Sequence, residues 1–156
     1  MSARPKDKFF VLVVDDSEDD RFLLKESLRR TTRLEVINEV CDGREAISYF
    51  QGHADYSNRK KFPLPDLLLL DLQMPFKNGF EVLEWLSAHP PDNLTVVVLT
   101  DSMQPEHIKR ALDLGADLFQ VKPVIRRERE AMVLALEDYL VNNNTLTPAH
   151  AVLRHK

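Results

Sequence analysis

Side chains suited to binding cations and phosphate stand where apolar segments of this chain end. They are Asp15 and Asp16 after the run 9–14, Asp71 after four leucines, Thr100 after the run 95–99, and Lys122 before Pro123. Carboxylates bind cations, while a hydroxyl or an ammonium group can donate hydrogen bonds to phosphate oxygens. These residues are spread over most of the chain, so chance is a poor explanation for their shared position.

Three neighbouring carboxylates need a compensating charge. Two carboxylates about 4 Å apart repel by roughly 4 kcal/mol at an effective dielectric constant of about 20, so three together require cations or raised pKa values. Every donor in this set is an oxygen, the chain has a single cysteine, and none of its histidines ends an apolar run. Such a donor set favours Mg²⁺ over zinc or copper.

A carboxylate beside Mg²⁺, with an ammonium and a hydroxyl within reach, can accept a phosphoryl group. In that reaction Asp71 would attack phosphorus in line, and Lys122 would neutralise charge on the phosphoryl oxygens. The Thr100 hydroxyl would donate a hydrogen bond to the new phosphoryl group and move inward with the loop behind it. The residue types therefore predict phosphoryl transfer onto Asp71.

The elements that must position these residues alternate along the chain. Short apolar runs rich in β-branched residues predict strands at 9–14, 34–40, 66–71, 95–100 and 116–122. Helical spacing predicts helices from Ser17 onward and at 44–51, 79–88, 105–114 and 128–141. In the first helix Ser17 is the expected cap, and the expected apolar stripe is Phe22, Leu23, Leu24 and Leu28.

Alternating strands and helices predict a doubly wound α/β fold with a parallel sheet, right-handed crossovers and helices on both faces. In such a sheet, ligands bind beyond the carboxyl ends of the strands, near the point where strand order reverses. The polar side chains should therefore meet at one edge. Flavin binding is disfavoured, because the first turn carries acids where a phosphate needs hydroxyl and amide donors.

Length and composition limit the function classes. The chain has 156 residues, 44% of them hydrophobic, which predicts one domain with its own core. A formal charge of -4 disfavours nucleic-acid binding. The single cysteine, Cys41, is expected to be a small buried residue, and cytoplasm is the default location. No apolar run approaches the roughly 18 residues of a membrane span, and no signal peptide is expected.

The chain resembles a known family, the response-regulator receiver domains of two-component signalling. The resemblance runs from about Lys8 to Asn144. The motifs that carry it are Val14-Asp15-Asp16, the run from Leu70 to Pro75 followed by Gly79, Leu99-Thr100, and Val121-Lys122-Pro123. The family's fold is flavodoxin-like, with strand order 2-1-3-4-5, and we expect that order here.

The resemblance implies a role for each matching residue. Asp71 matches the phosphorylated aspartate, and the implied Mg²⁺ ligands are Asp16 directly, Asp15 through water, Asp71 itself and the backbone carbonyl of Gln73. Thr100 matches the switch hydroxyl and Lys122 the lysine that pairs with phosphate. Phe119 matches the aromatic residue that changes rotamer on phosphorylation; the other interpretation is that it only packs the strand with Leu118. The phosphoryl donor would be a phosphohistidine on a sensor histidine kinase.

Several residues near the site match no fixed role in the family. Asp101 follows the switch threonine, where the family usually has a small residue; it would either repel a phosphate donor or water, or only form a turn or cap. Gln73 stands at a variable position and is expected to tune phosphate lifetime. Glu18, Asp19 and Asp20 are expected only to favour the start of a helix.

The receiver domain is expected at 8–144, with terminal extensions at 1–7 and 145–156 and no separate output domain. The signal would then leave through the surface formed by residues 105–114 and 118–143, the face of the fourth helix, fifth strand and fifth helix. A homodimer is expected there from an excess of apolar residues, which are Val124, Ile125, Met132, Val133, Leu136, Tyr139 and Leu140. Residues 126–130 are expected to be a solvated helical turn.

The long loop before Asp66 and the acidic run 16–20 resemble single-domain regulators paired with bacterial phytochrome kinases. Two other functions compete with the phosphorylated switch. A receiver-like binding module that works without phosphate is favoured by Asp101 and opposed by the complete set of site residues. A haloacid-dehalogenase-like phosphatase is disfavoured, because Gln73 stands where that class usually has a general acid.

Overall fold

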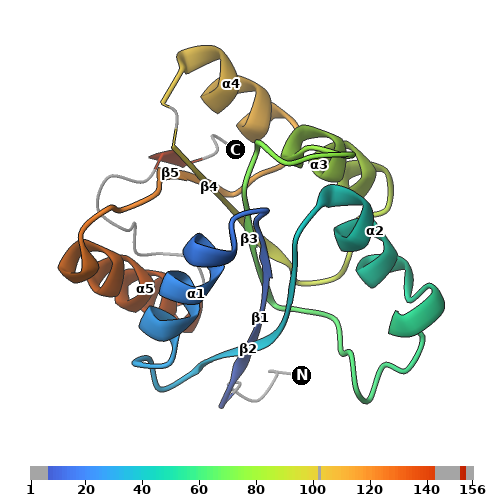
Figure 1. Cartoon of the computed structure of the whole chain (residues 1–156), viewed down its shortest axis with the longest axis horizontal. Helices are drawn as coiled ribbons and strands as arrows, with labels where there is room; N and C mark the ends of the chain where they lie inside the picture. Colours follow the sequence, from blue (N-terminus) through green and yellow to red (C-terminus); the bar gives the residue numbers. More distant parts are fainter. Residues whose placement is uncertain (1–6, 102, 143–151, 154–156) are drawn as a thin grey trace.

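The computed structural model describes residues 7–101, 103–142 and 152–153. Its centre is a parallel sheet in the order β2-β1-β3-β4-β5 (Figure 1). The strands are β1 (Phe9–Val14), β2 (Leu34–Val40), β3 (Leu67–Leu70), β4 (Thr95–Thr100) and β5 (Leu118–Val121). The predicted doubly wound, flavodoxin-like fold is confirmed.

Five helices cover the two faces of this sheet. They are α1 (Glu18–Leu28), α2 (Gly43–Gln51), α3 (Gly79–Ala88), α4 (Pro105–Asp113) and α5 (Arg126–Val141). Helices α1 and α5 lie side by side on one face, and α2, α3 and α4 cover the other (Figure 1). The side chains of Ser17, Asp42 and Asn78 accept hydrogen bonds from the first turns of α1, α2 and α3.

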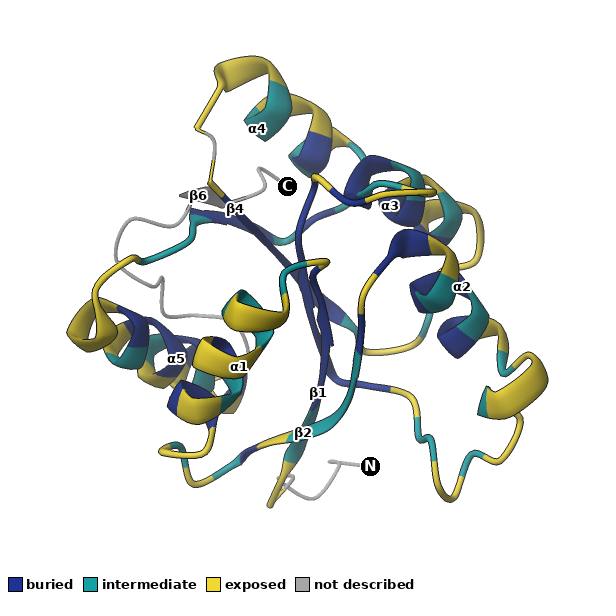
Figure 2. Cartoon of the chain, in the orientation of Figure 1, coloured by how far each residue is buried: buried dark blue, intermediate teal, exposed yellow. Residues whose placement is uncertain are grey.

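The core consists of two apolar layers, one on each side of the sheet (Figure 2). Side chains of a strand alternate between the faces, so Leu68 and Leu70 pack toward α2 and α3, while Leu67 and Leu69 pack toward α1 and α5. All four leucines of β3 are buried. Burial on both faces is why the central strands are continuous apolar runs, and it holds their carboxyl ends at fixed positions.

Three apolar residues near the edges of the fold are exposed, contrary to prediction. On α1, Leu24 and Leu28 face the core, but Phe22 and Leu23 face outward with 58% and 39% of their surface exposed. Cys41 is also exposed, because it follows β2, the edge strand of the sheet. Helical spacing identified the buried stripe of α1 correctly at Leu24 and Leu28 but wrongly included Phe22 and Leu23 in it.

Helix α5 also differs from the prediction. Five of the seven apolar residues assigned to a partner surface are buried in the core: Met132, Val133, Leu136, Tyr139 and Leu140. Only Val124 and Ile125, which precede the helix, are exposed. In the turn expected to be solvated, Arg129 is buried and its guanidinium donates to the Val124 carbonyl. The exposed apolar surface in this region is therefore smaller than the sequence predicted.

A short sixth strand, β6 (Val152–Leu153), pairs antiparallel with β5. Residues 145–156 are predicted to be a terminal extension, because a two-residue strand is too short to give a periodic signal. The remaining residues of that segment, and residues 1–6, lie outside the described part of the chain. Among the described helices, none combines the length and the apolar composition needed to cross a lipid bilayer.

Candidate functional site

The site is built on the carboxyl ends of β1 and β3. Beyond the last residue of each strand, ladder-type hydrogen bonds continue for one more residue: Asp15 N donates to Val40 O at 3.2 Å, and Asp71 N donates to Val14 O at 2.9 Å. These bonds fix the backbones of both acids relative to neighbouring strands. The sheet therefore sets the position of both carboxylates.

Three carboxylates meet at this edge. Oxygens of Asp15, Asp16 and Asp71 all lie within 4.8 Å of one another. Asp15 and Asp71 are buried, and Asp16 is exposed. An all-oxygen set of this size suits a hard divalent cation, and the concentration of negative charge gives such an ion a reason to bind. The residues present therefore fit the Mg²⁺ that the sequence predicted.

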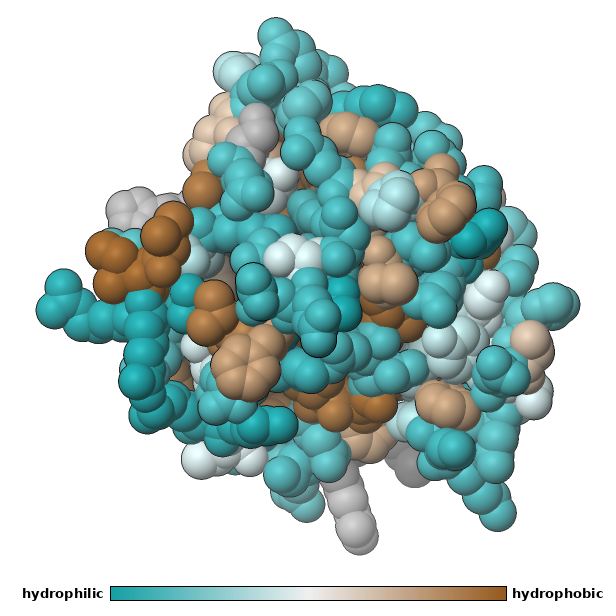
Figure 3. Space-filling view, viewed as in Figure 1, coloured by the Kyte–Doolittle hydropathy of each residue, from teal (hydrophilic) through white to brown (hydrophobic). Residues whose placement is uncertain are grey.

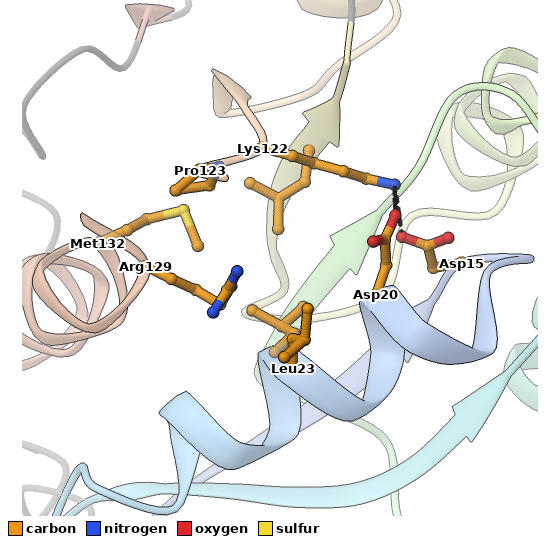
Figure 4. A pocket seen from close by; sticks show the side chains of 9 residues that line it. Asp15, Asp20, Leu23, Lys122, Pro123, Arg129 and Met132 are labelled. Atoms are coloured by element: carbon orange, nitrogen blue, oxygen red, sulfur yellow. Dashed lines mark hydrogen bonds and ion pairs between the residues drawn. The ribbon is translucent and has the colours of Figure 1, made fainter. Parts of the chain in front are cut away.

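The Lys122 ammonium lies among these acids. Its Nζ is 2.7 Å from Asp15 Oδ2, 2.9 Å from Asp20 Oδ2 and 3.6 Å from Asp71 Oδ2. Figure 4 shows the lysine side chain reaching from the end of β5 to Asp20 on α1, with Asp15 beside it. The Lys122 backbone N–H donates to Thr100 O at 2.8 Å, and this bond fixes the backbone of Lys122 relative to β4.

The ionisation of Asp71 is perturbed. Its pKa is raised from the ordinary 3.8 to about 7; burial is the main cause, the Lys122 ammonium opposes the rise, and the charge of Asp15 adds to it. For Lys122, burial alone would lower the pKa, but the carboxylates of Asp15 and Asp20 outweigh it, and the net pKa is raised. The lysine is therefore a permanent cation at neutral pH.

The Asp71 carboxylate has weak hydrogen bonding for a buried acid. Within the described part of the chain, its contacts are the Gln73 N–H at 3.4 Å and the Lys122 ammonium at 3.6 Å. Both distances are long for hydrogen bonds to a carboxylate. A desolvated carboxylate held by few donors keeps its lone pairs available to an incoming electrophile.

The loop after Asp71 packs closely against its surroundings. A Cβ on Gly79 would lie 2.4 Å from the Asp71 carbonyl oxygen, so only glycine lets α3 begin this near the acid. In the same loop Phe76 has φ 64°, the left-handed region, with its ring 71% exposed under the Arg44 guanidinium. This strain, about 1 kcal/mol or more for a non-glycine residue, was not anticipated from sequence.

The remaining predicted residues lie in β4 and β5 or shortly after β3 and β4. Thr100 ends β4 and is 2% exposed, and Phe119 in β5 is fully buried in the layer that α4 covers. Gln73 is exposed, two residues after Asp71. Asp101 is exposed in a bend, and the residue at the N-cap position of α4 is Gln104, so Asp101 does not cap that helix.

Asp20 is the residue of the site that the sequence reasoning missed. It was assigned only to the favourable start of α1, because acids in a first helical turn need no further explanation. The structure places its carboxylate against Lys122, which is 102 residues away in the chain. Nothing in the local sequence signals this contact, since Asp16, four residues earlier, lies before the helix.

The fold and site together define a class of protein. A family profile for the response regulator receiver domain matches residues 11–134, and this chain belongs to that family. The match contains Asp15, Asp16, Asp71, Thr100 and Lys122, the residues brought together at the carboxyl edge.

Similar proteins include two cyanobacterial response regulators, Rcp1 and RcpA. Response regulator Rcp1 of Synechocystis sp. is 31% identical over 140 residues, which is 89% of this chain and 93% of Rcp1. The crystal structure of the phosphorylated cyanobacterial phytochrome response regulator RcpA has a TM-score of 0.77 at 29% identity, covering 89% of this chain and 98% of RcpA. The Mn²⁺-bound structure of Rcp1 has a TM-score of 0.74 at 32% identity, covering 89% and 99%.

Proposed function

We propose that this protein is a single-domain response regulator that accepts a phosphoryl group on Asp71 from a phosphohistidine of a sensor kinase. The observation that carries the proposal is the state of Asp71: a buried, weakly bonded carboxylate with a cationic lysine and two further acids beside it. The match to Rcp1 over 93% of that regulator's length supports a chain that acts without an attached output domain.

In the proposed reaction an Asp71 carboxylate oxygen attacks phosphorus. The new O–P bond forms as the P–N bond to the donor histidine breaks, and the departing imidazole takes a proton and leaves neutral. Lys122 neutralises charge on the phosphoryl oxygens, and the Thr100 hydroxyl donates a hydrogen bond to one of them. When bound to Asp15, Asp16, Asp71 and the Gln73 carbonyl, Mg²⁺ would neutralise the acids and the transferred group.

Hydrolysis of the Asp71 phosphoryl group would end the signal. Water attacks the phosphoryl group, the O–P bond to Asp71 breaks, and inorganic phosphate leaves. We infer that Gln73 and Asp101 influence this step, because both are exposed and lie next to site residues, where they can affect the approach of water. The protein would thus be a self-resetting switch and not an enzyme for a separate substrate.

The output surface proposed is the face of α4, β5 and α5, to which Thr100 and Phe119 would transmit the change. Val124 and Ile125 are 87% and 55% exposed beside a groove of about 520 Å³ that α5 residues Glu128, Ala131 and Ala135 also line. Figure 3 shows hydrophobic side chains gathered over the connection between β5 and α5. This small apolar patch would support a homodimer or the docking of an effector.

The kinase partner proposed is a bacterial phytochrome kinase, because RcpA, a phytochrome response regulator, is similar to this chain over 98% of its own length. We place the reaction in the cytoplasm, where ATP is available to the kinase. A second candidate function, a binding module that needs no phosphate, is supported by Asp101, whose negative charge lies next to Thr100.

Phosphorylation chemistry separates the two candidates. The protein would be incubated with Mg²⁺ and acetyl phosphate, and its intact mass measured at intervals. The account predicts a mass gain of one phosphoryl group, which disappears when EDTA is added before the donor. A protein whose mass is unchanged under conditions that phosphorylate a known receiver would be assigned to the binding-module class.

A further inference from the structure

The Lys122 ammonium is held closer to Asp20 than to the proposed phosphoryl acceptor. It lies 2.9 Å from Asp20 and 3.6 Å from Asp71 (Figure 4). The Lys122 side chain is only 14% exposed, so its charge is satisfied mainly by these acids and Asp15. An ammonium has three N–H donors, and two of them already have short acceptors outside Asp71.

The turn of α1 that carries Asp20 is anchored on three sides. The Asp20 N–H donates to the Ser17 hydroxyl at 3.2 Å, which fixes the start of the helix. The neighbouring Arg21 guanidinium donates to the Asp15 carbonyl at 2.7 Å and to Glu39 on β2 at 3.0 Å. Asp20 therefore presents its carboxylate to Lys122 from a helical turn whose next residue, Arg21, binds the residue after β1 and a residue of β2 through its side chain.

We infer that Asp20 is a positioning residue that competes with the phosphoryl group for Lys122. This inference rests on the proposed phosphorylation of Asp71. While Asp71 is unmodified, Asp20 and Asp15 hold the ammonium. When a phosphoryl group is present, Asp20 competes with it for the Lys122 ammonium, so Asp20 weakens the phosphorylated state.

Charge and exposure set the size of the effect. Asp20 is 40% exposed, so water can solvate its carboxylate once the lysine leaves, and the contact is one that a dianionic group can displace. Asp20 also adds a fourth negative charge to an edge that already holds Asp15, Asp16 and Asp71. Both effects oppose the binding of an anion at Asp71, and both disappear together when the carboxylate is neutralised.

The test compares Asp20→Asn with a matched control, Asp19→Asn. Asp19 stands in the same helical turn, is exposed and carries the same charge, and the described residues show no ion pair between it and Lys122. Beryllofluoride, a mimic of the phosphoryl group, would be titrated calorimetrically at fixed Mg²⁺. We expect Asp20→Asn to bind it roughly threefold to tenfold more tightly than the wild type, and Asp19→Asn less than twofold more tightly.

A double-mutant cycle shows whether the effect passes through the lysine. In a Lys122→Met background, Asp20→Asn should lose most of its advantage, whereas a general stabilisation of α1 would persist. Thermal unfolding of each variant checks that the fold is retained, and Asp20→Ala gives a second removal of the carboxylate.

Each outcome decides a different claim. Equal or weaker beryllofluoride binding by both Asp20 variants would overturn the inference, and weaker binding would mean that Asp20 aligns Lys122 for the phosphoryl group. An advantage that survives undiminished in Lys122→Met, or that Asp19→Asn shares in full, would also overturn it. If the wild type binds no beryllofluoride in Mg²⁺ while remaining folded, the proposed function itself fails.

Discussion

Two buried aspartates flank the same four leucines at opposite ends of β3, and their surroundings differ. Asp66, before the strand, is 9% exposed, and Asp71, after it, is 6% exposed. Asp66 Oδ2 accepts the Phe10 N–H at 2.8 Å, and its backbone bonds to β1 and β4 at 2.8 and 2.9 Å. Among the described residues, the Asp71 carboxylate has only the long contacts given above and two acids as neighbours.

Burial of an acid does not by itself define a functional site. A carboxylate that accepts a short backbone hydrogen bond is a structural group, since its negative charge has a fixed partner and helps to join two strands. A carboxylate buried without such a donor raises the free energy of the folded protein until a cation or a covalent partner arrives. The comparison predicts that Asp66 contributes to stability and Asp71 to reactivity.

The largest effect expected is the loss of phosphorylation in Asp71→Asn. The amide has no anionic oxygen for attack, so transfer from acetyl phosphate or from a phosphorylated kinase should fall by at least about 100-fold. The matched variant Asp66→Asn should be phosphorylated at the wild-type rate. Radiolabel transfer at equal protein concentrations measures both, and loss of transfer in Asp66→Asn alone would reverse the assignment.

Lys122→Met should give the next largest effect. Removal of the cation that faces the transferred group is expected to slow phosphorylation by acetyl phosphate by roughly 10- to 100-fold. The variant also leaves the buried Asp15 carboxylate without its 2.7 Å partner, so unfolding should become easier. Stopped-flow kinetics and urea unfolding check the two effects separately. A phosphorylation rate unchanged from wild type would remove Lys122 from the reaction.

The pKa of Asp71 predicts a dependence of stability on pH. Its folded-state pKa is raised to about 7, so between pH 4 and 7 the folded protein holds a proton that the unfolded chain has released. The free energy of unfolding should therefore fall as pH rises through this range, by on the order of 1 to 4 kcal/mol, with the loss complete above pH 7.

Urea unfolding at pH 5 and pH 8 in EDTA measures this slope, and Asp71→Asn provides the reference that lacks it. Added Mg²⁺ should reduce the loss at pH 8, because a bound cation favours the ionised carboxylate. A wild-type protein that gained stability relative to Asp71→Asn from pH 5 to pH 8 in EDTA would contradict the assigned burial of Asp71.

The smallest effect concerns the other end of the strand. Asp66→Ala removes the acceptor for the Phe10 N–H and should lower the free energy of unfolding by about 1–2 kcal/mol. Phosphorylation should be unaffected, since the carboxyl edge keeps all of its groups. Chemical unfolding measures the first and mass gain with acetyl phosphate the second; unchanged stability would show that Asp66 is not a structural acid.

The sequence was sufficient for the sheet and for the location of the site. Continuous apolar runs identified the strands, and the polar residues that end them had to meet because parallel strands share an edge. Which side chains face solvent at the edges of the fold could not be predicted in the same way. Phe22 and Cys41 are exposed because α1 and β2 have neighbours on one side only, which composition does not reveal.

Contacts between side chains far apart in the chain could not be predicted from the sequence either. Asp20 has an adequate local explanation at the start of α1, so its contact with a lysine 102 residues away gave no additional local signal. The same holds for Asp66, whose sequence position could not distinguish a hydrogen-bonded acid from a reactive one. Local rules identified where acids stand, whereas their chemical roles depend on donors supplied by other strands.

A crystal structure with Mg²⁺ and beryllofluoride would test the central claim most directly. The account predicts beryllium bonded to a carboxylate oxygen of Asp71, Mg²⁺ against Asp15 and Asp16, and the Lys122 ammonium turned from Asp20 toward a fluorine. A structure with Asp71 unmodified at saturating beryllofluoride, or with the Asp16 and Asp71 carboxylates directed to separate parts of the molecule, would contradict it.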